Sequence, residues 1–239
     1  MKNSRITTTL IISSIIAQRV LFEMAGRTYY VFPFASDMII RPGSSFDFLQ
    51  LLYVYLPIVF ILFEFWGRSR DLVEGYGKLL IIRAYNRMRL CLITILRMSA
   101  ILFGIVLFQV IVFCIGDGEW VHLTIKESII ILCSYYLGLL GIILLQFLLE
   151  LLVSCELANI ITNVFVVVSL FVGFHLIPYD NSGIVSIALF PNLAFASRNG
   201  IINSQYIVTI FDMPTVPLFV IIVILLIGSV VVFRKKDIL

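Results

Sequence analysis

The sequence predicts an all-α membrane protein: a polytopic bundle of six transmembrane helices that forms one domain over residues 1–239. Two observations predict this class. The chain is 61% hydrophobic and 13% charged, whereas soluble chains are roughly 45–50% apolar and about 25% charged. Its apolar residues also gather in six segments long enough to cross about 30 Å of hydrocarbon. A soluble enzyme, a disordered chain and a nucleic-acid binder are therefore excluded, and a net charge of +3 gives nucleic acid little to bind.

The gaps between charged residues locate the spans, because lipid tolerates few ionised side chains. The expected spans cover approximately residues 6–24, 48–66, 91–114, 127–154, 158–178 and 215–233. An amino-terminal signal peptide is not expected, since Ile15-Ile16-Ala17 is a poor cleavage site. The segment 180–214 carries several Asn, Gly and Pro residues, so we place it outside the lipid or as pieces that dip in from the outer side.

Lys and Arg are divided unevenly between the two sides of this expected bundle. Eleven lie on the side that holds both termini and the loop 67–90, and five lie on the other. Cytoplasmic loops carry the excess of basic residues in membrane proteins. Both termini and the loop 67–90 are therefore expected in the cytoplasm.

The loop 67–90 carries the most distinctive pattern in the chain. From Leu79 onward, apolar and basic residues alternate at helical spacing, which predicts an amphipathic helix at the inner surface. Two interpretations stay open: a helix that only contacts anionic lipid, or a docking element for a cytoplasmic partner. Gly75 and Gly77 do not make a phosphate-binding loop, because Lys78 is followed by Leu79 rather than by Ser or Thr.

The order of these features matches a known layout. Its elements are Pro57, Glu64 and Trp66, then Arg70, Asp71 and Glu74-Gly75, then Leu79-Leu80-Ile81-Ile82-Arg83, then Leu189-Phe190-Pro191-Asn192, and finally Arg234-Lys235-Lys236. Together with six spans and cytoplasmic ends, this layout resembles the type-2 permeases of bacterial ATP-binding-cassette exporters. Within that type it is most similar to the small permeases of Gram-positive bacteria that accompany bacteriocin or lantibiotic immunity and peptide export.

The resemblance implies a transport subunit of the bacterial cytoplasmic membrane with no catalytic residues of its own. It implies a pore built by two permease chains, identical or different, and ATPase subunits that hold ATP and Mg and dock on a coupling helix between helices 2 and 3. The implied substrate is an amphipathic peptide or antibiotic-like molecule. The implied docking residues are Arg70, Asp71, Glu74, Tyr76, Lys78, Arg83, Tyr85 and Arg87.

Three ionised side chains fall inside the expected spans. At 1.5 Å per residue from the cytoplasmic ends, Glu64 lies about 3 Å in, Glu150 about 6 Å and Arg97 about 9 Å. Charges inside a membrane need a partner or a wet cavity. We expect Arg97 to pair with Glu64 or Glu150, since consecutive antiparallel spans are usually neighbours; the alternative is that it extends to the headgroups with no specific partner.

Two pairs of polar residues share a helical face. Gln146 and Glu150 are four positions apart, as are Asn159 and Asn163, so each pair should turn away from lipid. Gln146, Asn159 and Asn163 then line a translocation path or tie neighbouring helices together, and the residues alone leave both interpretations open.

Two other function classes remain to be weighed. An intramembrane enzyme needs paired His residues one turn apart or a Ser–His pair at matched depth, whereas His122 and His175 are 53 positions apart, so no enzyme is expected. A non-transporting membrane anchor or sensor that recruits a cytoplasmic partner through the same basic loop stays open as the alternative to a transport subunit.

Overall fold

The described part of the chain is a bundle of helices. The computed structural model describes residues 4–24, 48–75, 77, 86–114, 125–177, 184–196, 198 and 214–236. Its long helices are α1 (Ser4–Met24), α2 (Phe48–Phe65), α5 (Arg87–Cys114), α6 (Ile125–Leu152), α7 (Cys155–Leu176) and α9 (Thr215–Lys235), and its short ones are α3 (Arg68–Val73), α8 (Ile184–Ala188) and the 3-10 helix η3 (Phe190–Ala194). No strand occurs in these ranges, so the all-α prediction is confirmed.

Four of these helices are long and apolar enough to cross a membrane: α5 up to Phe113, α6, α7 and α9. In α1 the apolar stretch is shorter, Ile6–Leu21. The helix α5 begins at Arg87, earlier than the span expected from Cys91. The reason is that hydropathy marks the part of a helix that suits lipid, while backbone hydrogen bonding continues into the polar residues before it.

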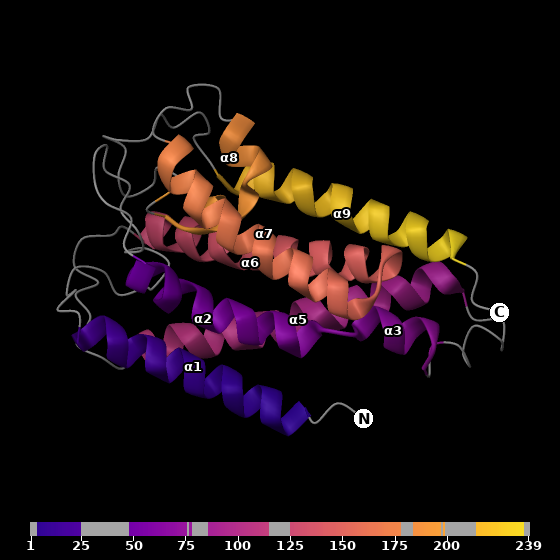
Figure 1. Cartoon of the computed structure of the whole chain (residues 1–239), viewed down its shortest axis with the longest axis horizontal. Coiled ribbons are helices and arrows are strands. Elements are labelled where there is room, and N and C mark those ends of the chain that lie inside the picture. Colours follow the sequence, from indigo (N-terminus) through magenta and orange to yellow (C-terminus); the bar gives the residue numbers. More distant parts are fainter. Residues whose placement is uncertain are drawn as a thin grey trace.

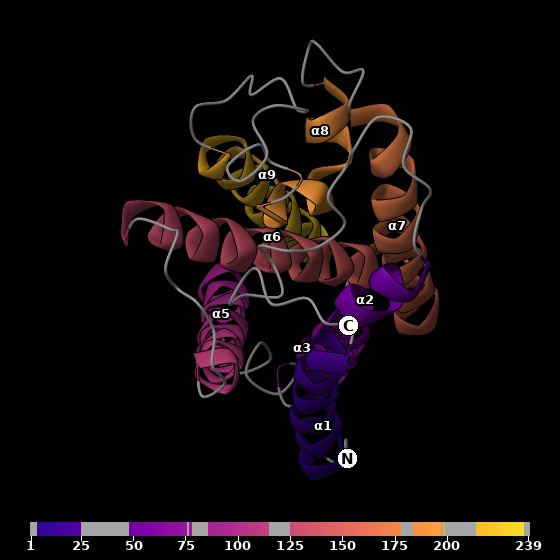
Figure 2. The ribbon, with the colours of Figure 1, turned by 90° about the vertical axis from the view of Figure 1, so that its left-hand side faces the viewer.

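The six long helices alternate in direction, so that the start of α1 and the end of α9 point toward the same end of the bundle (Figure 1). Viewed from one end, α6 lies in the centre, with α5 and α9 on one side and α7 and α2 on the other (Figure 2). The contacts agree, because α6 packs against α2, α3, α5, α7, α9 and η3, whereas α1 packs against α2 and α5.

The central place of α6 is not visible in its composition. The most apolar windows of α5 and α6 are equally apolar, yet 33% of the residues in the α5 window are buried and 56% of those in the α6 window. What distinguishes α6 is the pair Gly138 and Gly141, which leaves one side of the helix without side chains at these two positions. A neighbouring segment can therefore approach the α6 backbone closely.

That neighbouring segment is η3. A Cβ added at Gly138 would lie 2.4 Å from the Ala194 Cβ, and one added at Gly141 would lie 3.1 Å from the Phe190 ring. Every residue of η3 is buried, and η3 packs against α6, α7 and α9. Of the two placements expected for residues 180–214, the structure has η3 inside the bundle, whereas α8 before it has no buried residue.

A Gly138→Ala substitution should lower the thermal stability of the purified protein in detergent. The new methyl group overlaps Ala194, and overpacking of this kind costs about 1–3 kcal/mol. The higher helix propensity of alanine returns only about 1 kcal/mol.

The matched control is Gly104→Ala on α5, where an added Cβ meets nothing within 4 Å. It should leave the unfolding temperature unchanged or raise it. Equal upward shifts in both variants would contradict the tight packing of η3 against α6.

Candidate functional site

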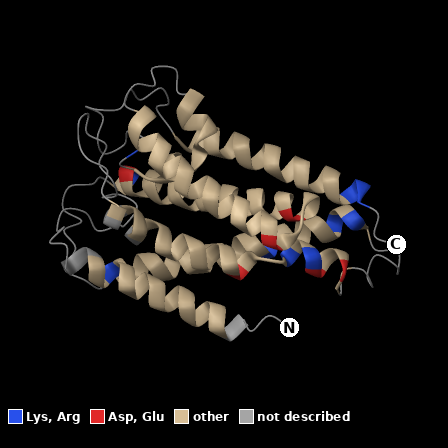
Figure 3. Cartoon of the chain, in the orientation of Figure 1, with Lys and Arg blue, Asp and Glu red and all other residues tan. Residues whose placement is uncertain are grey.

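Charged side chains gather at one end of the bundle, which we call the charged end (Figure 3). It is formed by the end of α2, by α3, by the start of α5, by the turn between α6 and α7, and by the end of α9. The basic side chains described there are Arg68, Arg70, Arg87, Arg89, Arg234, Lys235 and Lys236. Those described at the opposite end are Arg19, Lys126 and Arg198.

The helix α3 begins immediately after α2 at this end. Gly67 has a φ of 78°, in the left-handed region that glycine adopts without steric cost, so the chain turns from α2 into α3 within two residues. Ser69 and Leu72 of α3 are buried, whereas Arg70 and Asp71 are exposed. The helix is thus attached by one face and presents charges on the other.

Two side chains on α6 hold this corner, and we call them the Gln146–Glu150 clasp. Gln146 Nε2 donates to Leu62 O at 3.3 Å, one of the last four carbonyls of α2, which lack a partner within their own helix. Glu150 Oε1 accepts from Gly67 N at 2.8 Å and Oε2 accepts from Ser69 N at 3.2 Å. The carboxylate therefore caps the start of α3.

The clasp is internally connected and buried. Gln146 Nε2 also donates to Glu150 Oε1 at 3.2 Å, and the two residues are only 1% and 3% exposed. Polar groups buried among apolar side chains are stable only when they are hydrogen-bonded, and each one left unpaired costs about 1–3 kcal/mol. The corner between α2 and α3 therefore cannot leave α6 without a substantial cost.

The second buried carboxylate joins α1 to the same corner. Glu64 Oε1 lies 3.0 Å from Arg68 Nη2, and the Thr7 hydroxyl donates to Glu64 Oε2. Among the described residues, no ion pair within 4 Å joins Arg97 to Glu64 or to Glu150, so the predicted pairing of Arg97 with either is wrong. The prediction relied on the similar depths of Arg97, Glu64 and Glu150 along their spans. In the structure Glu64 instead pairs with Arg68, and Glu150 accepts from the backbone amides at the start of α3.

Arg97 is exposed and lines a cavity of about 350 Å³ between α3 and α5, together with Arg68 and Asp71. It has no ion-pair partner within the part of the chain that the structure describes.

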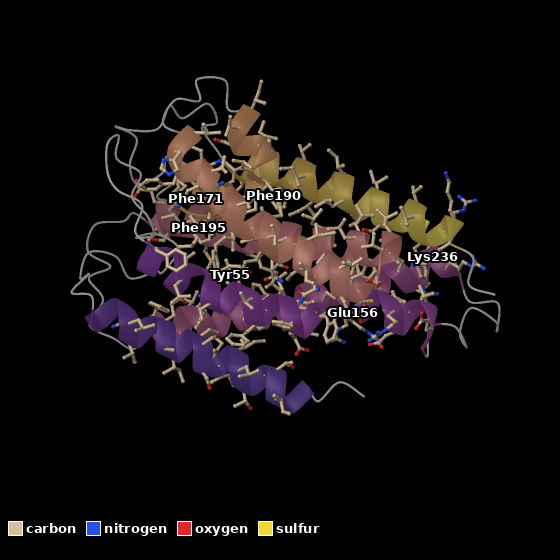
Figure 4. The ribbon with its side chains drawn as sticks, in the orientation of Figure 1. Tyr55, Glu156, Phe171, Phe190, Phe195 and Lys236 are labelled. Atoms are coloured by element: carbon tan, nitrogen blue, oxygen red, sulfur yellow. The ribbon has the colours of Figure 1, made fainter. Side chains whose placement is uncertain are left out.

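A smaller cleft of about 260 Å³ separates α3 from the turn between α6 and α7. Arg70 Nη1 lies 3.5 Å from Glu156 Oε1 there, with both side chains about half exposed. Lys236 Nζ donates to Leu151 O at 2.7 Å, which caps the end of α6. Glu156 and Lys236 both lie at the charged end in Figure 4. The lining residues are Ser69, Arg70, Val73, Glu74, Glu150, Val153, Ser154, Cys155, Glu156 and Lys236.

The structure brings some of the predicted docking residues together and leaves others undescribed. Arg70 and Asp71 lie on α3 and Glu74 directly follows it, while Arg87 begins α5 and donates to Lys236 O at 3.3 Å. Outside the described residues lie Tyr76, Lys78, Arg83, Tyr85 and most of the predicted amphipathic helix.

The two asparagines of α7 are bonded to each other and to α2. Asn163 Nδ2 donates to Asn159 O at 2.7 Å and to Asn159 Oδ1 at 3.0 Å. Tyr55, which lies in the middle of the bundle in Figure 4, donates its hydroxyl to Asn163 Oδ1 at 2.6 Å. In this conformation the pair ties α7 to α2, and its role in a translocation path stays a prediction.

Sequence reasoning missed a buried polar cluster toward the opposite end. Arg198 is 1% exposed, and its Nη1 donates to Leu170 O at 2.7 Å and to Asn192 Oδ1. Asn192 Nδ2 donates in turn to Ser169 O at 2.9 Å. These bonds hold η3 against α7. The available signal was a lone arginine after an uncharged segment with Pro and Asn, which also suits an outer loop.

Metal binding finds no support in the described ranges, where no group of three or more His, Cys, Asp or Glu residues is placed to hold an ion. That this chain binds no cofactor of its own stays a prediction.

A Glu150→Ala substitution should accelerate hydrogen–deuterium exchange in peptides that cover residues 67–73. The amides of Gly67 and Ser69 would lose their buried acceptor. A loss of about 1–3 kcal/mol corresponds to exchange that is roughly 5- to 140-fold faster.

The control is Glu156→Ala, which removes a carboxylate from the neighbouring helix. Its exposed ion pair with Arg70 contributes about 0–1 kcal/mol, so exchange in residues 67–73 should stay close to that of the wild type. Indistinguishable exchange in the two variants would show that Glu150 does not hold α3.

Comparison with known proteins places the chain in a family but gives no activity. A curated protein of Bacillus subtilis (strain 168), named "Uncharacterized protein YybK", is 26% identical over 218 residues, which cover 87% of each chain. No solved structure matches. The family described as "Protein of unknown function (DUF2705)" matches residues 11–239. Because this match covers nearly the whole sequence, the chain belongs to the DUF2705 family.

Proposed function

We propose that this chain is the membrane-spanning permease subunit of an ATP-binding-cassette exporter in the bacterial cytoplasmic membrane. The observation that carries the proposal is the attachment of α3. A short charged helix stands at one end of an apolar bundle, and the Gln146–Glu150 clasp fixes it to the central helix α6. A partner protein shifts a conformational equilibrium only through contacts that differ between the two states. An ATPase subunit therefore needs a contact helix that is rigidly attached to the membrane-spanning helices, and α3 is attached in this way.

The distribution of charge supports a cytoplasmic position for α3. Seven of the basic side chains that the structure describes lie at the charged end and three at the opposite end. Arg97, ten residues into α5, is counted in neither group. The positive-inside rule then puts the charged end, and both termini with it, in the cytoplasm. In this orientation all six long helices span the membrane, α1 and α2 included.

The contacts give a mechanical route through the subunit. An ATPase subunit, which holds ATP and Mg, docks on the exposed face of α3 and in the cleft beside it, where Arg70, Glu74 and Glu156 supply charges of both signs. Movement of α3 passes through Glu150 to α6. The α6 helix packs against α7, α9 and η3, so it carries the movement toward the opposite end.

The substrate and the second permease chain rest on the resemblance alone. By that resemblance the pore contains a second permease, identical or different, and exports an amphipathic peptide or antibiotic-like molecule, as in bacteriocin immunity. Gln146, Asn159 and Asn163 line the path only if the bonds that now join them to Leu62, Glu150 and Tyr55 rearrange during transport. A non-transporting anchor or sensor would use the same charged end to recruit a different partner.

Copurification with a tagged full-length chain tests this function. We expect a protein with a phosphate loop and an ATP-binding-cassette signature sequence to copurify and to hydrolyse ATP. The double charge reversal Arg70→Glu with Glu74→Lys should abolish its recovery, because both side chains are exposed at the proposed docking face. The fold should tolerate the change, since exposed ion pairs contribute at most about 1 kcal/mol.

The matched control is Lys126→Glu, a charge reversal at the exposed start of α6 on the opposite end, which should leave recovery unchanged. Recovery of the ATPase with the double variant would contradict docking on α3. Recovery of a partner without ATPase motifs would favour the anchor or sensor instead.

A further inference from the structure

The cavity between α3 and α5 is separate from the cleft proposed for docking, although the exposed Asp71 of α3 lines it, and it has its own chemistry. It has a volume of about 350 Å³, within the range of roughly 300–1,000 Å³ that is usual for small-molecule sites. One wall carries Arg68 and Asp71 from α3, and the other carries Arg97 from α5. Leu90, Ile93 and Ile101 make the rest of the α5 wall largely apolar.

The arginines leave hydrogen-bond donors to spare. Arg68 gives Nη2 to Glu64, but its buried Nε has no hydrogen-bond partner in the described part of the chain. Arg97 makes no ion pair within the described ranges. Guanidinium groups with unused N–H donors bind phosphate well, because phosphate oxygens accept short, charge-assisted hydrogen bonds from them.

The charges on the cavity lining also indicate that the ligand carries a positively charged group beside its phosphate. Glu64 offsets Arg68. Among the described residues of the lining, this leaves one charge of each sign without an ion pair, Arg97 and Asp71. No ion pair within 4 Å joins Asp71 to either arginine among the described residues. A ligand that bears both a phosphate and an ammonium group would complement Arg97 and Asp71 at once.

The position of the cavity identifies a lipid as the source of that ligand. The 28 residues of α5 span about 42 Å at 1.5 Å each, which exceeds the hydrocarbon thickness of about 30 Å. Arg97 lies ten residues, or about 15 Å, from the start of α5. If the excess length is shared between the two ends, Arg97 lies about 9 Å inside the hydrocarbon boundary at the charged end, from which a long arginine side chain extends toward the headgroups. Arg97 and Ile101, one turn apart, are both exposed on the flank that would face lipid.

The geometry points to a binding site for a phosphatidylethanolamine headgroup in the leaflet at the charged end. Its phosphate accepts from Arg97, its ammonium group donates to Asp71, and the guanidinium of Arg68 on the cavity lining adds positive charge beside the phosphate. One acyl chain runs along Ile93 and Ile101 of α5. This site requires only that α5 lies in a membrane, so it is independent of the exporter proposal.

Native mass spectrometry of the full chain in detergent, titrated with phosphatidylethanolamine, tests the site. Wild type should bind this lipid more tightly than phosphatidylglycerol or phosphatidylcholine, which lack a primary ammonium group. Arg97→Gln should weaken phosphatidylethanolamine binding about ten-fold or more. Asp71→Asn should remove the preference over phosphatidylglycerol while retaining the binding of both.

The matched control is Arg234→Gln, an exposed arginine at the same end that does not line the cavity, and it should bind lipid as wild type does. Equal affinity of Arg97→Gln and Arg234→Gln would overturn the site, because Arg97 would then only extend to the surface. Competition by soluble glycerophosphoethanolamine at the same concentration as the lipid would also overturn it, since the apolar wall would then contribute nothing.

Discussion

The contact on which this structure depends is the clasp that two α6 side chains make on the corner between α2 and α3. Gln146 satisfies a carbonyl at the end of one helix and Glu150 satisfies two amides at the start of the next. Helix ends are where unpaired backbone groups collect, and a membrane interior offers them no water. Because of the clasp, α3 and α6 should move together as one rigid unit, although the two helices are far apart in sequence.

The same solution recurs through the bundle. Tyr55 and Asn163 join α2 to α7. Gln109 joins α1 to α6 by donating to Gln18 at 3.0 Å and accepting from Tyr135 at 3.1 Å. Lipid tails are as apolar as leucine, so helices in a membrane gain little from apolar contact alone, and hydrogen bonds and close packing at small residues hold them together. The polar side chains in these spans act first as cross-links, and any transport path must open by breaking some of them.

The sequence predicted the helical class and the ranges of the long helices because lipid imposes a length and a composition that a single chain displays. It also identified Glu64 and Glu150 as buried charges that need partners. It did not predict the hydrogen-bond partners of these two carboxylates. Depth along a span does not reveal which face of a helix a residue occupies, and the sequence does not show which backbone amide, such as Gly67 N, a carboxylate will bond. Arg198 was missed for a related reason. It bonds to Asn192 of η3, and η3 packs closely against Gly138 and Gly141 of α6 and against Gly173 of α7, where an added Cβ would overlap the Asn192 side chain. This packing exists only once the fold has formed.

Oxidative crosslinking of Ser69→Cys to the native Cys155 tests the clasp most directly. Ser69 on α3 and Cys155 at the start of α7 both line the cleft between α3 and the α6–α7 turn, so a crosslink between the two positions reports how closely α3 packs against that turn. The experiment is done in native membranes, with the other three cysteines replaced by alanine. The clasp predicts rapid and nearly complete crosslinking when Glu150 is present and much slower crosslinking when Glu150 is alanine. Equal rates with and without Glu150 would show that α3 is held by something else, and would contradict the account.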